Sequence, residues 1–182
     1  MPNKGTPLGP LRILLVEDSP EDAELVVDQL LEAGLQIEFE RVDNEPAMRG
    51  ALEAWMPDIV LSDLSMPGFS GYYALHILRE LHPSVPFIFV SGTMGEETAV
   101  EALQHGANDY IIKHQPARLP SAVARLVRET RSERERLRVE DELMRAQRLE
   151  SLALLAAGLS HDLRNILQPL LIIPDLIRDR SD

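Results

Sequence analysis

Short apolar runs alternate with amphipathic stretches over the first two thirds of the chain. The clearest run, residues 59–62, ends on Asp63 and is followed by a Pro-Gly break, which is typical of a strand buried on both faces. The run at residues 37–42 is weaker and has interleaved acidic residues, which is typical of a half-exposed strand. The pattern predicts five strands, at residues 11–16, 37–42, 59–62, 87–90 and 110–112.

Between these runs, apolar residues recur at helical spacing. Ser19 and Asp22 are spaced as a capping box with Pro20 at the first helical position, and Thr93 and Glu96 repeat the box spacing. Helices are predicted at residues 20–33, 45–55, 70–81 and 93–105. Strands that alternate with helices imply right-handed crossovers, so we expect an α/β fold with a five-stranded, mostly parallel, doubly wound sheet.

A single long helix is predicted from about Ser121 into the 160s. No Gly occurs between Leu119 and Gly158 and no Pro between Pro120 and Pro169, and the segment is rich in Arg, Glu, Leu and Ala. Apolar residues in its first half are compatible with a partial coiled-coil seam that charged residues interrupt.

The net charge of −12 is concentrated in one part of the chain. Residues 1–119 carry 7 Lys+Arg against 19 Asp+Glu, which argues against nucleic-acid binding there and favours a site that collects cations. The chain has no cysteine, so disulfides and thiolate metal sites are excluded. No signal-like or membrane-spanning stretch occurs, and we expect a cytoplasmic protein whose residues 1–10 form a flexible tail.

Chemically useful side chains follow the predicted strands at their carboxyl ends. They are Glu17, Asp18, Asp63, Ser91 and Lys113. Carboxyl ends of parallel strands meet at one edge of the sheet, where ligands bind. Crowded carboxylates repel, and a hard cation such as Mg²⁺ relieves the repulsion. A hydroxyl and an ammonium group opposite them suit a transferred phosphoryl group, so the set predicts a carboxylate nucleophile that accepts phosphate.

Residues 11–119 resemble a two-component receiver domain of flavodoxin-like fold. The matching positions are Val16-Glu17-Asp18, Asp63 with Met66-Pro67-Gly68 behind it, Ser91, and Gly106 to Tyr110 leading to Lys113. The resemblance implies that Asp63 is phosphorylated from a phosphohistidine on a histidine kinase or phosphotransfer protein. It also implies that Lys113 contacts the phosphoryl group.

The resemblance further implies the metal ligands and the switch residues. Mg²⁺ is expected on Glu17, Asp18, Asp63 and the backbone carbonyl of Ser65, while Ser91 and Tyr110 are expected to rearrange on phosphorylation. Two positions depart from the common pattern. Lys113 is followed by His114-Gln115-Pro116 instead of directly by proline, so no cis peptide is assumed after it. Gly92 stands where a small alanine is common.

The last part of the predicted helix carries a sharper apolar stripe. Its members are Leu152, Leu155, Leu159, Leu163, Ile166 and Leu170, which at about 100° per residue share one face. His161 falls opposite the stripe, and Asn165 shares its face. The surroundings of His161 resemble the phosphotransfer helix of sensor histidine kinases. By that resemblance His161 is phosphorylated from ATP, Asp162 acts as its base, and Asn165 orients the reaction.

Together the two resemblances indicate a hybrid histidine kinase fragment. Residues 120–150 would form a signalling helix or coiled coil, and 151–182 the first helix of the phosphotransfer domain. The chain reaches Asp182 before a second hairpin helix or an ATP-binding domain, so we expect no autophosphorylation by this chain alone. The exposed stripe predicts a homodimer through the long helices.

Two other interpretations remain open. The chain could be an interaction protein, in which a receiver heads a dimeric coiled coil and His161 has no chemical role. It could also resemble a haloacid-dehalogenase-like hydrolase, which likewise uses an aspartyl nucleophile. That family has a second Asp two residues after the first, where this chain has Ser65.

Overall fold

The structure is a computed structural model that describes residues 9–92, 95–113 and 117–178 of the 182. In the last helix, the side chains of His161, Ile166 and residues 168–178 lie outside the description. The chain divides into two compact units, Met1–Glu133 and Arg134–Asp182. In the part of the chain that is described, no helix combines the length and apolar character needed to cross a bilayer.

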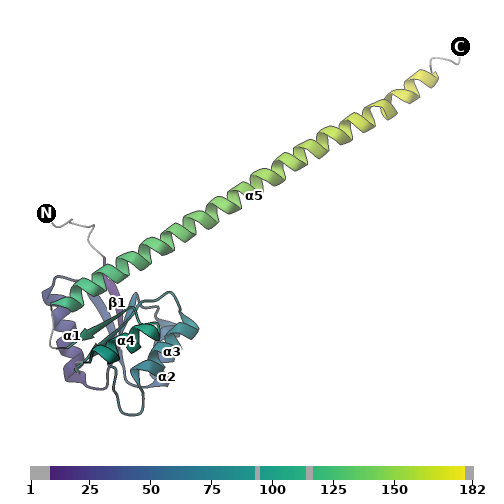
Figure 1. Cartoon of the computed structure of the whole chain (residues 1–182). Coiled ribbons are helices and arrows are strands. Elements are labelled where there is room, and N and C mark those ends of the chain that lie inside the picture. The colour runs from purple at the N-terminus through teal and green to yellow at the C-terminus, as the bar shows by residue number, and fades with distance from the viewer. Residues whose placement is uncertain (1–8, 93–94, 114–116, 179–182) are drawn as a thin grey trace. The chain divides into compact units, whose positions relative to one another are not determined.

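Strands and helices alternate in the first unit (Figure 1). The strands are β1 (Leu11–Val16), β2 (Ile37–Val42), β3 (Ile59–Ser62), β4 (Phe87–Ser91) and β5 (Asp109–Ile112). The helices are α1 (Pro20–Glu32), α2 (Glu45–Ala54), α3 (Gly71–Leu81), α4 (Glu96–Gln104) and α5 (Arg118–Arg178). The five strands and the long C-terminal helix that the hydrophobic pattern predicts are therefore confirmed.

The sheet is parallel throughout, in the order β2-β1-β3-β4-β5. Two separate groups of buried side chains cover its faces. One contains residues of α2, α3 and α4, among them Met48, Leu75 and Ala102, and the other contains residues of α1 and α5, among them Leu30 and Val123. Helices on both faces make this the predicted doubly wound fold.

The strand register brings the two acidic segments together. Val16 pairs with Ser62 at the ends of β1 and β3, and the amide of Asp63 donates to the carbonyl of Val16 at 2.9 Å. Residues 17–18 and Asp63 consequently leave the sheet side by side at its carboxyl edge. These strands lie next to each other although another strand and two helices separate them in the sequence.

Side chains cap several of the helices. Ser19 caps α1, Asn44 caps α2 and Ser70 caps α3, each accepting from an amide three residues on. The predicted capping box at residues 93–96 is wrong. Gly95 holds the N-cap position of α4 with no side-chain hydrogen bond, and Thr93 lies outside the described residues. Helix α4 thus begins at Glu96, later than the box spacing predicts.

The first turns of α5 belong to the core of the first unit. Leu119, Val123 and Val127 are at most 1% exposed and pack in the same group as β1 and β3. One turn on, Arg131 holds Asp58 through two hydrogen bonds, from Nε at 3.1 Å and Nη2 at 2.8 Å. The first compact unit therefore includes the start of α5, up to Glu133.

Gly71, the first residue of α3, is needed because a Cβ there would collide with the loop that begins at Asp63. It would overlap the Asp63 carbonyl oxygen and lie 2.8 Å from the ring of Phe89. We expect Gly71→Ala to destabilise the fold by about 1–3 kcal/mol, measured as the free energy of unfolding in urea.

Gly50 provides a matched control. It lies exposed within α2, and no atom comes within 4 Å of a Cβ built on it. Gly50→Ala should stabilise the protein by about 0.5–1 kcal/mol, because Ala loses less backbone entropy than Gly in a helix. Equal stability of the two variants would contradict the steric role given to Gly71.

Candidate functional site

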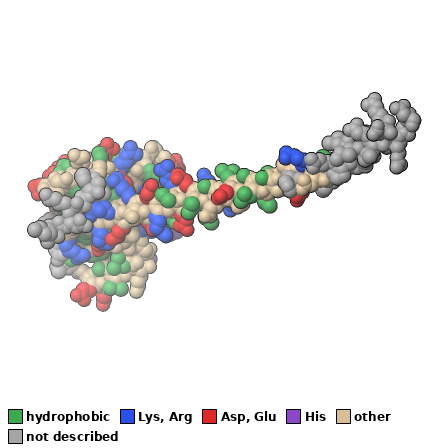
Figure 2. Space-filling view, turned by 90° about the horizontal axis from the view of Figure 1, so that it is seen from above, with side chains coloured by type: hydrophobic (Ala, Val, Ile, Leu, Met, Phe, Trp, Pro, Cys, Tyr) green, Lys and Arg blue, Asp and Glu red, His purple; other side chains and the backbone are tan. Residues whose placement is uncertain are grey.

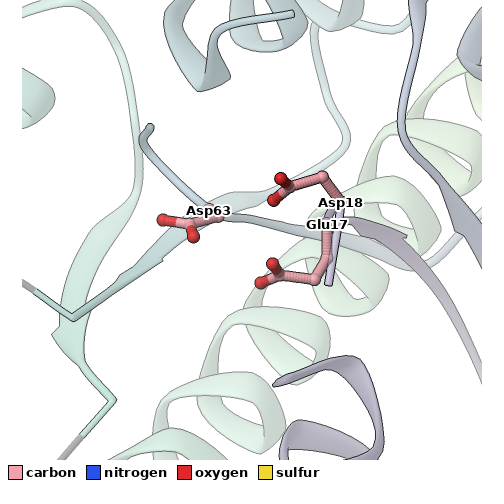
Figure 3. Close-up of side chains that lie close together, drawn as sticks. All are labelled: Glu17, Asp18 and Asp63. Atoms are coloured by element: carbon pink, nitrogen blue, oxygen red, sulfur yellow. The ribbon is translucent and has the colours of Figure 1, made fainter. Parts of the chain in front are cut away.

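Three carboxylates converge at the carboxyl edge of the sheet (Figure 3). Glu17 and Asp18 follow β1 and Asp63 follows β3, and one oxygen from each lies within 4.8 Å of the others. Glu17 is buried, Asp63 is half-buried and Asp18 is exposed. The convergence predicted from the strand ends is therefore present.

Lys113 lies among these carboxylates. Its Nζ donates to Glu17 Oε2 at 2.9 Å, to Asp63 Oδ2 at 3.0 Å and to an oxygen of Asp22. The Lys113 amide donates to the carbonyl of Ser91 at 2.8 Å, which ties the end of β5 to the end of β4. A single cation thus bridges groups that lie 50 to 96 residues away in the sequence.

Burial and charge act in opposite directions on these groups. Burial alone would lower the pKa of Lys113, but its hydrogen bonds to Asp22, Glu17 and Asp63 outweigh burial, so the pKa is raised and the ammonium stays charged. Burial raises the pKa of Glu17, and Lys113 only partly offsets this. One ammonium shared among three carboxylates cannot fully compensate each of them. The site therefore retains an excess of negative charge.

Backbone amides orient two of the carboxylates. Glu17 Oε1 accepts from the amide of Ser19 at 3.2 Å, and Asp63 Oδ1 accepts from the amide of Leu64 at 2.6 Å. The second oxygen of each carboxylate faces Lys113. The carboxylates of Glu17 and Asp63 are thus held in place before any ligand binds.

The donor set fits Mg²⁺. The three carboxylates supply hard oxygen ligands, lie close enough to share one ion, and leave an open side at Asp18 for water. Glu17, Asp18 and Asp63 are the side chains that would hold the ion. The backbone carbonyl of Ser65 remains a predicted fourth ligand.

The two predicted switch residues are both buried. Ser91 ends β4 and is 2% exposed, and Tyr110 on β5 is 7% exposed and packs in the core group of α2, α3 and α4. A Cβ on Gly92 would meet nothing within 4 Å, so packing does not require glycine there. Residues 114–116, which carry the other departure from the receiver pattern, lie outside the described residues.

The second predicted phosphoacceptor region lies on α5, in the unit after Glu133. Asp162 and Asn165 are exposed, while the side chain of His161 is outside the description. The backbone at these positions is helical, as predicted. The roles of His161, Asp162 and Asn165 stay predictions.

The sequence pattern missed two residues of the site. The Asp22 amide donates to the cap Ser19 Oγ at 3.2 Å as expected, but its carboxylate bonds Lys113 instead of completing the capping box. A charge-assisted bond to an ammonium is stronger than one to a neutral amide. Arg41 on β2 donates to the carbonyls of Glu17 and Asp18, at 2.8 and 3.4 Å. No local motif marks either contact.

The fold and this cluster define a doubly wound α/β domain with a candidate cation site at the carboxyl edge of its sheet. The family model for the response regulator receiver domain matches residues 13–124, and the chain belongs to that family. Two-component signal transduction through a receiver domain is thereby supported.

Among curated proteins, the chain is 34% identical to the regulatory protein LuxO of Vibrio vulnificus over 99 residues, which are 54% of this chain and 21% of LuxO. It is 36% identical to the response regulator protein FleR of Pseudomonas aeruginosa over 107 residues, 59% of this chain and 22% of FleR. The chain therefore spans about a fifth of the length of these relatives.

Solved structures with a similar fold include other signalling proteins. The signal receiver domain of a signal transduction histidine kinase from Syntrophus aciditrophicus is 32% identical with a TM-score of 0.56, over 65% of this chain and 91% of that one. NtrX from Brucella abortus is 27% identical with a TM-score of 0.64, over 72% of this chain and 30% of that one.

The Lys113 contacts predict a specific stability defect. In Lys113→Met the carboxylates of Glu17, Asp22 and Asp63 lose their shared cation, so we expect a loss of about 2 kcal/mol in EDTA. Mg²⁺ should stabilise the variant more than the wild type, because a bound divalent ion restores the missing positive charge. Urea unfolding with and without Mg²⁺ measures both effects.

Arg138→Met is the control for the loss of one positive charge. Arg138 is exposed on α5, where it pairs only weakly with Glu142 at 3.1 Å, so its removal should change stability by less than about 0.5 kcal/mol. A Lys113 variant as stable as this control in EDTA would contradict the charge-sharing account.

Proposed function

We propose that this chain receives a phosphoryl group on Asp63 from a phosphohistidine, with Mg²⁺ bound by Glu17, Asp18 and Asp63. The observation that supports it is the meeting of Asp63 with the Glu17–Asp18 pair and Lys113 at one edge of the sheet. We expect this transfer to take place in the cytoplasm, where ATP-dependent kinases supply phosphohistidine.

In the proposed step a carboxylate oxygen of Asp63 attacks phosphorus, and the phosphorus–nitrogen bond of phosphohistidine breaks with its electron pair returning to the imidazole. The amide of Leu64 holds Oδ1, and Lys113 lies at Oδ2, where it can neutralise charge on the phosphoryl oxygens. The metal ion supplies further neutralisation of that charge when bound.

The bound phosphate would act on the residues that line the neighbouring strand ends. The amide of Lys113 donates to the carbonyl of Ser91. Ser91 and Tyr110 would rearrange when the Lys113 side chain turns toward the phosphate. The α5 helix begins five residues after Lys113, and its first turns pack on the sheet. A change in receiver packing therefore has a direct route to the start of α5.

We also propose that residues 151–182 form the first phosphotransfer helix of a histidine kinase, with His161 as its phosphoacceptor. Asp162 would act as the base and Asn165 would orient the reaction. The support is the sequence resemblance, together with a helix that is unbroken from Ser151 to Arg178. The phosphate on Asp63 would come either from this site or from another phosphotransfer protein.

Self-association through α5 is supported by exposed apolar residues in the second unit. Leu152, Leu155, Leu159 and Leu163 share one face and are each more than half exposed, and Figure 2 shows hydrophobic side chains along this part of α5. Water-exposed apolar stripes of this kind are typically buried against a partner helix. A dimeric interaction protein with an idle His161 is the alternative that this observation also favours.

Phosphorylation by a small donor tests the Asp63 proposal. With acetyl phosphate and Mg²⁺ the chain should gain one phosphate that hydroxylamine removes, detected by intact-mass spectrometry. Asp63→Asn or EDTA should abolish the adduct, because the nucleophile or the metal ion is lost.

Two variants serve as controls for this test. Asp28→Asn removes an exposed carboxylate of α1 away from the cluster and should label as the wild type does. His161→Gln should also label normally, since a small donor bypasses the phosphohistidine. No adduct on the wild type, or an adduct that survives in Asp63→Asn, would refute the proposal.

The apolar face of α5 gives a matched pair for self-association. Leu159 lies on the stripe, whereas Leu154 is equally exposed but lies on the opposite side of the helix. Leu159→Glu should weaken dimerisation at least about tenfold, because it would bury a charge, and Leu154→Glu should leave it unchanged. Sedimentation equilibrium measures both, and a monomeric wild type would exclude the dimer.

A further inference from the structure

Arg41 lies beside the acidic pair without bonding either of its carboxylates. It is the penultimate residue of β2 and pairs in register with Leu15 of β1. Its Nη1 donates to the carbonyl of Glu17 at 2.8 Å and to the carbonyl of Asp18 at 3.4 Å. The carboxylate it pairs with is that of Asp43, at 3.5 Å.

The bonds from Arg41 act on the backbone that carries two predicted metal ligands. The loop between β1 and α1 is otherwise held at Glu17, whose amide donates to the carbonyl of Val42 at 3.0 Å, and at Ser19, whose amide donates to Glu17 Oε1. Without Arg41, the peptide planes after Glu17 and Asp18 could rotate. Rotation of these planes would move both carboxylates relative to Asp63.

Two effects of Arg41 on a cation site oppose each other. Its positive charge repels a second cation, while its hydrogen bonds hold the ligands in place. The repulsion is weakened because Arg41 is partly exposed and faces Asp43. Bonds from a charged donor are strong and directional. Partners that orient metal ligands commonly change metal affinity about 10- to 100-fold.

We propose that Arg41 is a positioning residue of the cation site, one that increases Mg²⁺ affinity despite its positive charge. This inference rests on the proposed Mg²⁺ site of Glu17, Asp18 and Asp63. It assigns a role in that site to β2, the strand at the edge of the sheet, which supplies no ligand.

The test is Mg²⁺ titration calorimetry on the full chain with charge-matched variants. Arg41→Gln should weaken Mg²⁺ binding roughly tenfold, although it removes a positive charge beside the site. Arg41→Lys keeps the charge but loses the guanidinium geometry, and should bind less tightly than the wild type. Arg12→Gln removes an exposed charge at the opposite end of β1 and should bind like the wild type.

Amide hydrogen exchange gives a second readout that does not depend on Mg²⁺ binding. In Arg41→Gln the amides of Ser19 and Asp22 should exchange faster, while the amides of β3 stay as protected as in the wild type. Unchanged or tighter Mg²⁺ binding by Arg41→Gln would overturn the inference. If that variant fails to fold, wild-type affinity in Arg41→Lys would overturn it.

The proposed function is tested by a different comparison, between the wild type and Asp63→Asn. If the wild type does not bind Mg²⁺, or if Asp63→Asn binds it as tightly as the wild type, the proposed metal site is refuted, whatever the effect of Arg41. If Mg²⁺ binding depends on Asp63 but not on Arg41, only the positioning role of Arg41 is refuted.

Discussion

Excess negative charge at one edge of the sheet is the constraint on which the rest of the site depends. Four carboxylates, those of Glu17, Asp18, Asp22 and Asp63, lie around a single ammonium group, and three of them bond it. Such an arrangement is costly unless the fold holds it in place. The same excess charge makes the site suitable for a divalent cation.

The two core groups, one on each face of the sheet, supply the rigidity that this arrangement requires. Strands β1, β3 and β4 are buried on both faces, so their carboxyl ends have little freedom to separate the charged groups. Gly71 permits the loop after Asp63 to pack against the start of α3, and Arg41 bonds the loop after β1. Packing and hydrogen bonds from other elements thus determine where the carboxylates lie.

The chain also links this receiver to a helix whose first turns are part of the receiver core. Leu119, Val123 and Val127 are buried against the sheet, and Arg131 bonds Asp58, the residue before β3. The segment that ends at Asp63 is therefore bonded to α5 at its other end, through Asp58. This shared packing gives a physical basis for the proposal that phosphorylation influences the helix.

The sequence by itself determined the strands, most helix starts and the placement of Glu17, Asp18, Asp63 and Lys113 at one edge of the sheet, because hydrophobic periodicity and strand-end position are local signals. Tertiary structure decided which groups pair. Asp22 has the spacing of a capping residue, yet its carboxylate bonds a lysine 91 residues away. Arg41, and the turns of α5 that enter the core, depend likewise on distances between elements. Local sequence patterns do not specify those distances, since only the assembled sheet brings the partners within bonding range.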